Sequence, residues 1–350
     1  MKDTAFLKGE LMEEKLRQYF LDNGYYVARG VKYKHDRLDI TDIDLFLYSK
    51  VSSLSRERIN VDIKNKKTPK AFERIIWAKG LQYLLLFDNC VVATSEKRES
   101  IRQYGKRHNV LILDGNFLQR LSYKIDNRIP EDIFLKDISQ VKSFNIFRDQ
   151  TWNNIYEDSK SRLLNELDFS GFNKSLITVK YFIEKCFNHQ KREQATRVLY
   201  ATLSHSLIIL DYILKDIMFL ELNLRKETLS DGFKFGNLGR EGVNNTIDMA
   251  IKITNSKIPA NLIKQSVDTN ETNILMDFFS RSEVSKNIFK IAIELESKAF
   301  ANTYITPDVL DISVRSYMYM FLDFFGINRK AFYDLYTEPK TKKDSTLNFS

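Results

Sequence analysis

Two stretches decide the fold of this 350-residue chain: Asp42-Ile43-Asp44-Leu45-Phe46-Leu47 and Ile59-Asn60-Val61-Asp62-Ile63-Lys64-Asn65. The second stretch alternates polar and apolar residues, which is typical of a β-strand. Successive side chains of a strand point to opposite faces, so Asp62 and Lys64 share one face of the sheet. Charged groups on a strand whose other face is buried cost free energy unless they bind something. The pair therefore marks a candidate functional site.

A second acidic strand supplies a further carboxylate. Asp44 lies near the start of a strand expected over residues 42–50, and a polar loop at 51–58 leads to the strand that carries Asp62. We expect the two strands to form a hairpin in which both carboxylates converge beside Lys64. Mg²⁺ prefers oxygen ligands and binds many proteins through one or two carboxylates. The sequence therefore predicts a metal site.

This set of residues suits the hydrolysis of a phosphodiester. A bound Mg²⁺ polarises a phosphoryl oxygen and lowers the pKa of a water ligand. A lysine beside that water can orient it or stabilise negative charge in the transition state. We expect Asp44 and Asp62 to be metal ligands, with the main-chain carbonyl of Ile63 as a third, and Lys64 to act on the water. Mn²⁺ is expected to substitute for Mg²⁺.

The surrounding sequence predicts a mixed sheet flanked by helices. The further elements expected are helix 7–23, strand 25–34, helix 69–87, strand 90–94, helix 95–109, strand 110–113 and helix 116–124. Their order, together with the two acidic strands, begins α-β-β-β-α-β.

This order and the acidic strands resemble the PD-(D/E)xK nuclease superfamily, whose restriction-endonuclease-like fold has an αβββαβ core. The run Gly9-Glu10-Leu11-Met12-Glu13, followed by Asn23-Gly24-Tyr25, is similar to the opening of methyl-directed restriction endonucleases and related repair and phage-defence nucleases. The resemblance covers residues 5–125. It implies that Glu13 coordinates the metal or a metal-bound water, with Glu10 and Glu14 as competing candidates.

The charge of the chain is uneven. Residues 1–120 hold 23 Lys and Arg against 16 Asp and Glu, whereas residues 121–350 hold 31 against 30. A basic first third favours binding to a polyanion, DNA more than RNA. The residues expected to grip phosphates on either side of the scissile bond are Lys66, Lys67, Lys70, Arg74 and Lys79. A solvated basic surface is the alternative for this cluster.

Other side chains with chemical potential are assigned structural roles. Trp77 and Tyr83 on helix 69–87 are expected in the core rather than stacked on bases. The four histidines lack the spacing of a metal motif. Arg197 precedes His205 by eight residues, which excludes the shorter Arg-to-His spacing of HEPN-type ribonucleases.

The length predicts more than one domain. We expect a nuclease domain at 1–125, a linker at 126–149, a separate all-helical domain at 150–336 and a flexible tail at 337–350. The nearly neutral helical domain is expected to bind a protein partner, to mediate self-association or to sense a trigger. Charged residues interrupt the most apolar long stretch, so no membrane span is predicted. The two distant cysteines favour a reduced, cytoplasmic setting.

The sequence thus predicts a Mg²⁺-dependent nuclease. The resemblance implies an endodeoxyribonuclease that acts in bacterial defence or restriction. Two alternatives stay open. One is a catalytically degenerate DNA-binding or scaffold protein on the same fold, in which Asp44, Asp62 and Lys64 form a structural ion pair. The other is a nuclease or toxin that acts on RNA.

Overall fold

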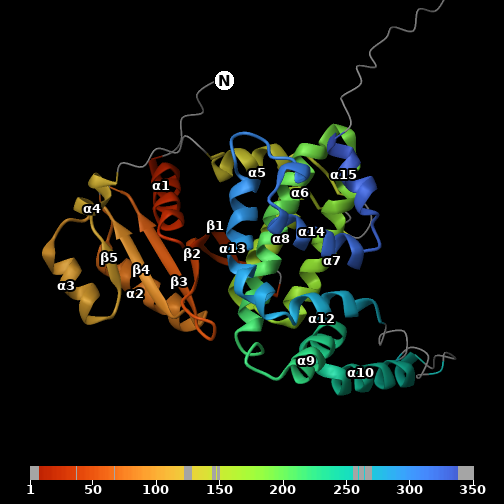
Figure 1. The fold of residues 1–350 in the computed structure, drawn as a ribbon. Coiled ribbons are helices and arrows are strands. Elements are labelled where there is room, and N and C mark those ends of the chain that lie inside the picture. Colours follow the sequence, from red (N-terminus) through yellow and green to blue (C-terminus); the bar gives the residue numbers. More distant parts are fainter. Residues whose placement is uncertain are drawn as a thin grey trace, which may run out of the picture.

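An α/β part and a helical part lie side by side in the computed structural model (Figure 1). The structure describes residues 8–36, 38–66, 68–121, 128–143, 147, 150–254, 259, 264 and 270–337. The α/β part contains α1 (Lys8–Asp22), β1 (Tyr26–His35), β2 (Leu38–Lys50), β3 (Arg56–Lys64), α2 (Ala71–Leu84), β4 (Asn89–Thr94), α3 (Glu99–Arg107), β5 (Leu111–Leu113) and α4 (Gly115–Arg120). The predicted order of helices and strands is therefore confirmed. The loop expected at 51–58 is shorter, because β3 already begins at Arg56.

The five strands form one mixed sheet in the order β1-β2-β3-β4-β5. β1, β2 and β3 pair in antiparallel fashion, whereas β3, β4 and β5 are parallel. Parallel neighbours need a crossover connection, and α2 and α3 supply the two crossovers. The expectation of a mixed sheet flanked by helices is confirmed at this level.

The two faces of the sheet have different covers. Leu45 and Val61 pack under Leu16 of α1, on the face that α1 and α4 cover. Side chains of the alternate residues point the other way. On that face Asn60 donates a hydrogen bond to the carbonyl oxygen of Ala78 on α2, at 3.2 Å. Residues 44, 60, 62 and 64 share this parity, so Asp44 of β2 and Asp62 of β3 point toward the α2 face.

The helical part is built around one long helix. Its helices are α5 (Glu131–Ser139), α6 (Trp152–Asn165), α7 (Phe169–Lys185), α8 (Arg192–Leu214), α9 (Leu222–Phe235), α10 (Gly239–Thr254), α12 (Asn273–Phe279), α13 (Ser282–Ala299), α14 (Ile312–Phe324) and α15 (Arg329–Thr337). By length and composition α8 could cross a membrane, yet 94% of its apolar window is buried inside the protein. It is the central core helix, packed against α6, α7 and α13 (Figure 1).

The helical part shares its core with the sheet, which corrects the expectation of a separate domain. Phe46 and Tyr48 of β2 belong to the same buried cluster as Leu207 of α8. β2 is apolar on both faces, so it needs a second cover besides α1. The segment expected to be a linker, 126–149, contains α5, whose Phe134 is buried in this cluster. The tail from residue 338 lies outside the described residues.

Candidate functional site

The carboxylates of Asp44 and Asp62 lie where β2 and β3 part. The pairing of the two strands ends at Leu45 opposite Val61, although β3 continues to Lys64. One residue further, the same register places Asp44 level with Asp62. Oδ2 of Asp44 accepts a hydrogen bond from the main-chain amide of Ile63, at 2.6 Å. The structure therefore brings the two predicted carboxylates together on neighbouring strands.

Asp62 is bound by Arg74, which the sequence assigned to phosphate binding. Nε of Arg74 donates to Oδ2 of Asp62 at 2.8 Å, and a second guanidinium nitrogen contacts Oδ1. Asp62 is only 6% exposed. A guanidinium that holds both oxygens of a buried carboxylate is a strong, directional ion pair. In this structure Arg74 therefore neutralises the candidate metal ligand.

Asp44 lies among positive groups. Burial raises the pKa of its carboxyl, whereas the hydrogen bond from Ile63 and the charges of Lys64 and Arg74 lower that pKa. Burial in turn lowers the pKa of the Arg74 guanidinium, and the negative charge of Asp44 opposes this effect. Lys64 is half-buried at the end of β3. Two carboxylates and two cationic side chains thus act on one another here. This acidic cluster consists of Asp44, Asp62, Lys64 and Arg74.

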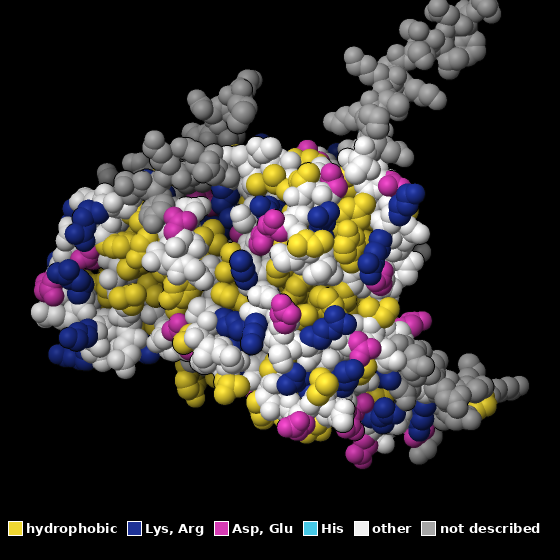
Figure 2. All heavy atoms as spheres, in the orientation of Figure 1, with side chains coloured by type: hydrophobic (Ala, Val, Ile, Leu, Met, Phe, Trp, Pro, Cys, Tyr) yellow, Lys and Arg dark blue, Asp and Glu magenta, His cyan; other side chains and the backbone are white. Residues whose placement is uncertain are grey.

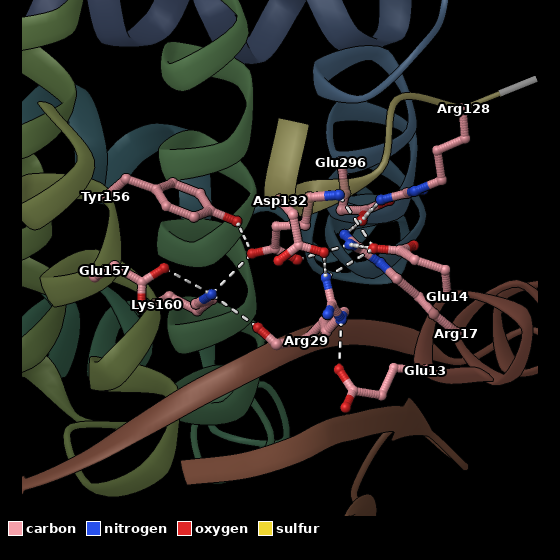
Figure 3. Close-up of polar contacts among 11 residues, drawn as sticks. Glu13, Glu14, Arg17, Arg29, Arg128, Asp132, Tyr156, Glu157, Lys160 and Glu296 are labelled. Atoms are coloured by element: carbon pink, nitrogen blue, oxygen red, sulfur yellow. Dashed lines mark hydrogen bonds and ion pairs between the residues drawn. The ribbon is translucent and has the colours of Figure 1, made fainter. Parts of the chain in front are cut away.

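Glu13 belongs to α1, which covers the face of the sheet opposite α2. Its Oε2 accepts a hydrogen bond from Nε of Arg29 at 2.8 Å (Figure 3). Burial raises the pKa of Glu13, Arg29 opposes the rise, and the charge of Asp44 adds to it, so the two carboxylates lie within electrostatic reach. Glu14 instead is fully buried and accepts hydrogen bonds from Arg29 and from the amide of Glu131. Of these two acids, Glu13 is therefore the better placed to interact with a metal bound at Asp44.

The two carboxylates of the cluster suit a metal ion that keeps most of its water ligands. Within the described ranges, no three His, Cys, Asp or Glu side chains form a group that could hold a metal ion. Mg²⁺ usually binds through one or two carboxylates and retains several waters, so Asp44 and Asp62 are sufficient in number. The guanidinium of Arg74 already forms an ion pair with the carboxylate of Asp62. A metal would replace it there.

No family model, curated protein or solved structure matches this chain. Its function therefore has to be inferred from its own residues and their geometry.

Behind Glu13 lies a buried ionic network that the sequence did not predict (Figure 3). Arg17 of α1 contacts Glu131 at 2.7 Å and Glu296 of α13 at 2.6 Å. Lys160 of α6 contacts Glu131 at 2.8 Å and donates to the carbonyl oxygen of Arg29 at 2.8 Å. Burial raises the pKa of Glu131, but Lys160 and Arg17 outweigh it and lower the pKa to about 2. The network ties the candidate site to the helical part.

The predicted phosphate-binding lysines differ in their surroundings. Lys66 is exposed, and Lys67 lies outside the described residues. Lys70 is exposed and forms a surface ion pair with Glu73 at 3.2 Å. Lys79 is half-buried and donates to Oε1 of Gln82 at 2.6 Å. Lys66 and Lys70 are therefore the lysines that a polyanion could reach most easily.

Two aromatic residues are placed differently from the prediction. Trp77 and Tyr83 were expected in the core, but they are 45% and 86% exposed. α2 buries one narrow stripe against β3 and β4, which Ala71, Ile75, Ala78 and Leu81 fill. The two rings lie outside this stripe because they project from the outward side of the helix. The expectation for both residues was wrong.

Proposed function

We propose that this chain is a Mg²⁺-dependent nuclease with a restriction-endonuclease-like core. The observation that carries the proposal is the placement of Asp44 and Asp62 side by side, with Lys64 two residues further along β3 on the same face. The αβββαβ order of the first elements and the mixed sheet support it. DNA is the proposed substrate, and defence against foreign DNA in the cytoplasm is the proposed setting. The nearly neutral helical part would meet a protein partner or a second copy of the chain.

Each residue of the cluster has a role in this proposal. Asp44, Asp62 and the main-chain carbonyl of Ile63 would hold Mg²⁺, and Glu13 would interact with a water bound to it. The metal would polarise a phosphoryl oxygen and lower the pKa of a water ligand, and Mn²⁺ would be able to replace it. The ammonium group of Lys64 orients the attacking water or stabilises the negative charge that develops on the phosphate.

Arg74 has two positions in this scheme. Without metal it holds Asp62, as observed. If Asp62 were to bind a metal instead, the guanidinium of Arg74 would be free at the edge of the site. There it can bind a phosphate beside the scissile bond, together with the exposed Lys66 and Lys70. The prediction that Arg74 binds nucleic acid is thus kept for the metal-loaded protein.

Cleavage assays test the proposal. Purified protein is incubated with plasmid DNA and with labelled DNA and RNA strands, in Mg²⁺, in Mn²⁺ or in a chelator. We expect cleavage of DNA that needs the metal, and its loss in Asp62→Ala. Lys64→Ala should lower the rate about 100-fold, the scale for removing one transition-state contact. Lys286→Ala, at an exposed position of α13 in the helical part, is the control and should retain the rate within about threefold. Equal cleavage by the wild type and Asp62→Ala contradicts the proposal.

A catalytically degenerate nucleic-acid-binding protein is the second candidate. The bidentate pair of Arg74 with Asp62 favours it, because such a pair already satisfies the carboxylate without a metal. This candidate predicts that DNA binding needs no divalent ion and that no metal restores cleavage. Metal-independent binding by a wild type that never cleaves DNA or RNA would support it.

A further inference from the structure

Trp77 is an exposed indole next to the candidate site. Its ring lies 5.8 Å from Cζ of Arg74, and Arg74 is the residue that holds Asp62. The other tryptophan of the chain, Trp152, is buried and donates its indole N–H to the hydroxyl of Tyr181 at 3.1 Å. Trp77 therefore offers a large, flat apolar surface to solvent within one side chain of the acidic cluster.

The stretch of sequence that contains this indole is rich in positive charge. Residues 64–107, which include α2 and α3, hold 11 Lys and Arg against 4 Asp and Glu, whereas the rest of residues 1–120 holds 12 of each. Figure 2 shows basic side chains gathered over the α3 end of the molecule. The exposed acid beside Trp77, Glu73, is paired with Lys70. The surface is thus complementary to a polyanion, and its apolar part is aromatic.

We propose that Trp77 stacks on an unpaired base of a single-stranded polynucleotide whose phosphates follow the exposed Lys66 and Lys70. Aromatic side chains beside a basic path are the usual way in which proteins hold single strands. Inside a duplex the faces of the bases are covered by their neighbours, so an indole can reach only an unpaired base. This inference deepens the proposed nuclease function, because it names unpaired DNA or RNA as the class of substrate.

Fluorescence of Trp77 reports the proposed contact directly. In full-length Trp152→Phe, Trp77 is the only tryptophan. The protein is titrated in a chelator with single strands of thymidine or uridine of about 15 nucleotides and with a blunt duplex of the same length. We expect both single strands to quench the emission and the duplex to quench it much less. Absence of quenching by the single strands, or equal quenching by the duplex, overturns the proposal.

Variants on the same helix give the matched comparison. Trp77→Ala should weaken single-strand binding about fivefold or more, since stacking on one base contributes about that much. Trp77→Phe should recover most of the affinity. Tyr83→Ala removes an exposed aromatic ring six residues further along α2 and should change the affinity less than about twofold. Wild-type affinity in Trp77→Ala contradicts the stacking role.

Failure of the stacking role of Trp77 can be told apart from failure of the nuclease proposal. Binding is measured without metal, so it does not depend on cleavage. Asp62→Ala is expected to lose cleavage and to retain quenching of Trp77. If no variant or wild type cleaves, but single strands still quench Trp77 and Trp77→Ala still binds weakly, the stacking role stands and the nuclease function fails.

Discussion

At the scale of single residues, Arg74 is decisive for the chemistry of the cluster. Its guanidinium and a divalent metal ion would occupy the same carboxylate, Asp62, so their binding is competitive. A divalent ion carries twice the charge, but it must give up part of its hydration to bind. The balance between the two cations decides whether the site is catalytic or degenerate.

His205 provides a prediction at this scale. It lies in the core, where its Nδ1 is 3.0 Å from Oγ of Ser159. Burial, with a smaller effect from the charge of Lys160, lowers the pKa of His205 to about 3. In the unfolded chain the imidazole has a pKa of about 6.5 and binds a proton more readily. The free energy of unfolding should therefore fall as the pH decreases below about 6.5, by about 1 kcal/mol per pH unit.

Urea unfolding between about pH 5 and pH 6 measures this slope, above the range in which most carboxylates titrate. His205→Asn removes the titrating group, so its free energy of unfolding should depend on pH less steeply than that of the wild type. Parallel curves for the two proteins would show that His205 does not contribute.

Part of the site could be predicted from the sequence. The alternation of a strand fixes which side chains share a face, and that was enough to place Asp62 with Lys64 and to bring Asp44 near them. The partner of Arg74 and the exposure of Trp77 could not be predicted. Both depend on how α2 is rotated on the sheet, and a helix with apolar residues on most sides does not reveal which side is covered.

At the scale of helices and strands, α5 connects the two parts of the molecule. Its first residue, Glu131, lies between Arg17 of α1 and Lys160 of α6 and also accepts a hydrogen bond from the hydroxyl of Tyr156 at 2.8 Å. Charged residues within apolar helical stripes are visible in the sequence. Their pairing is not, because the partners are far apart along the chain.

Glu131→Ala tests the importance of this connection. The change leaves Arg17 and Lys160 buried without their shared carboxylate, which should lower the free energy of unfolding by about 3–5 kcal/mol. Glu283→Ala, at an exposed position in the first turn of α13, is the control and should cost less than about 0.5 kcal/mol. Urea unfolding followed by circular dichroism measures both. Similar stabilities of the two variants would contradict the role given to the network.

At the scale of the whole molecule, one core joins the sheet and the helices. The order of elements in the first third could be predicted because each carries its own periodicity. The shared core could not be predicted. An apolar strand does not show whether the helix that covers it is a neighbour in sequence or lies more than 150 residues away. β2 is covered by α8 in this way.

The shared core predicts that residues 1–121 do not fold stably alone. Without the helical part, Tyr26, Phe46 and Tyr48 lose their cover, and Arg17 loses Glu131 and Glu296. We expect the fragment to bind a hydrophobic dye and to lack a cooperative thermal transition, as loosely packed states do. The full chain is the control. A fragment that melts cooperatively and binds no dye would show that the α/β part is an independent domain.

The central claim is that Asp44 and Asp62 form a pocket for a divalent cation, and Mn²⁺ binding tests it most directly. Free Mn²⁺ is measured by electron paramagnetic resonance during titration of the wild type, Asp62→Asn and Arg74→Ala. We expect Asp62→Asn to bind at least about tenfold more weakly than the wild type. Arg74→Ala should bind more tightly, because the competing guanidinium is gone. Equal affinities of the wild type and Asp62→Asn, or no binding even by Arg74→Ala, would contradict the claim.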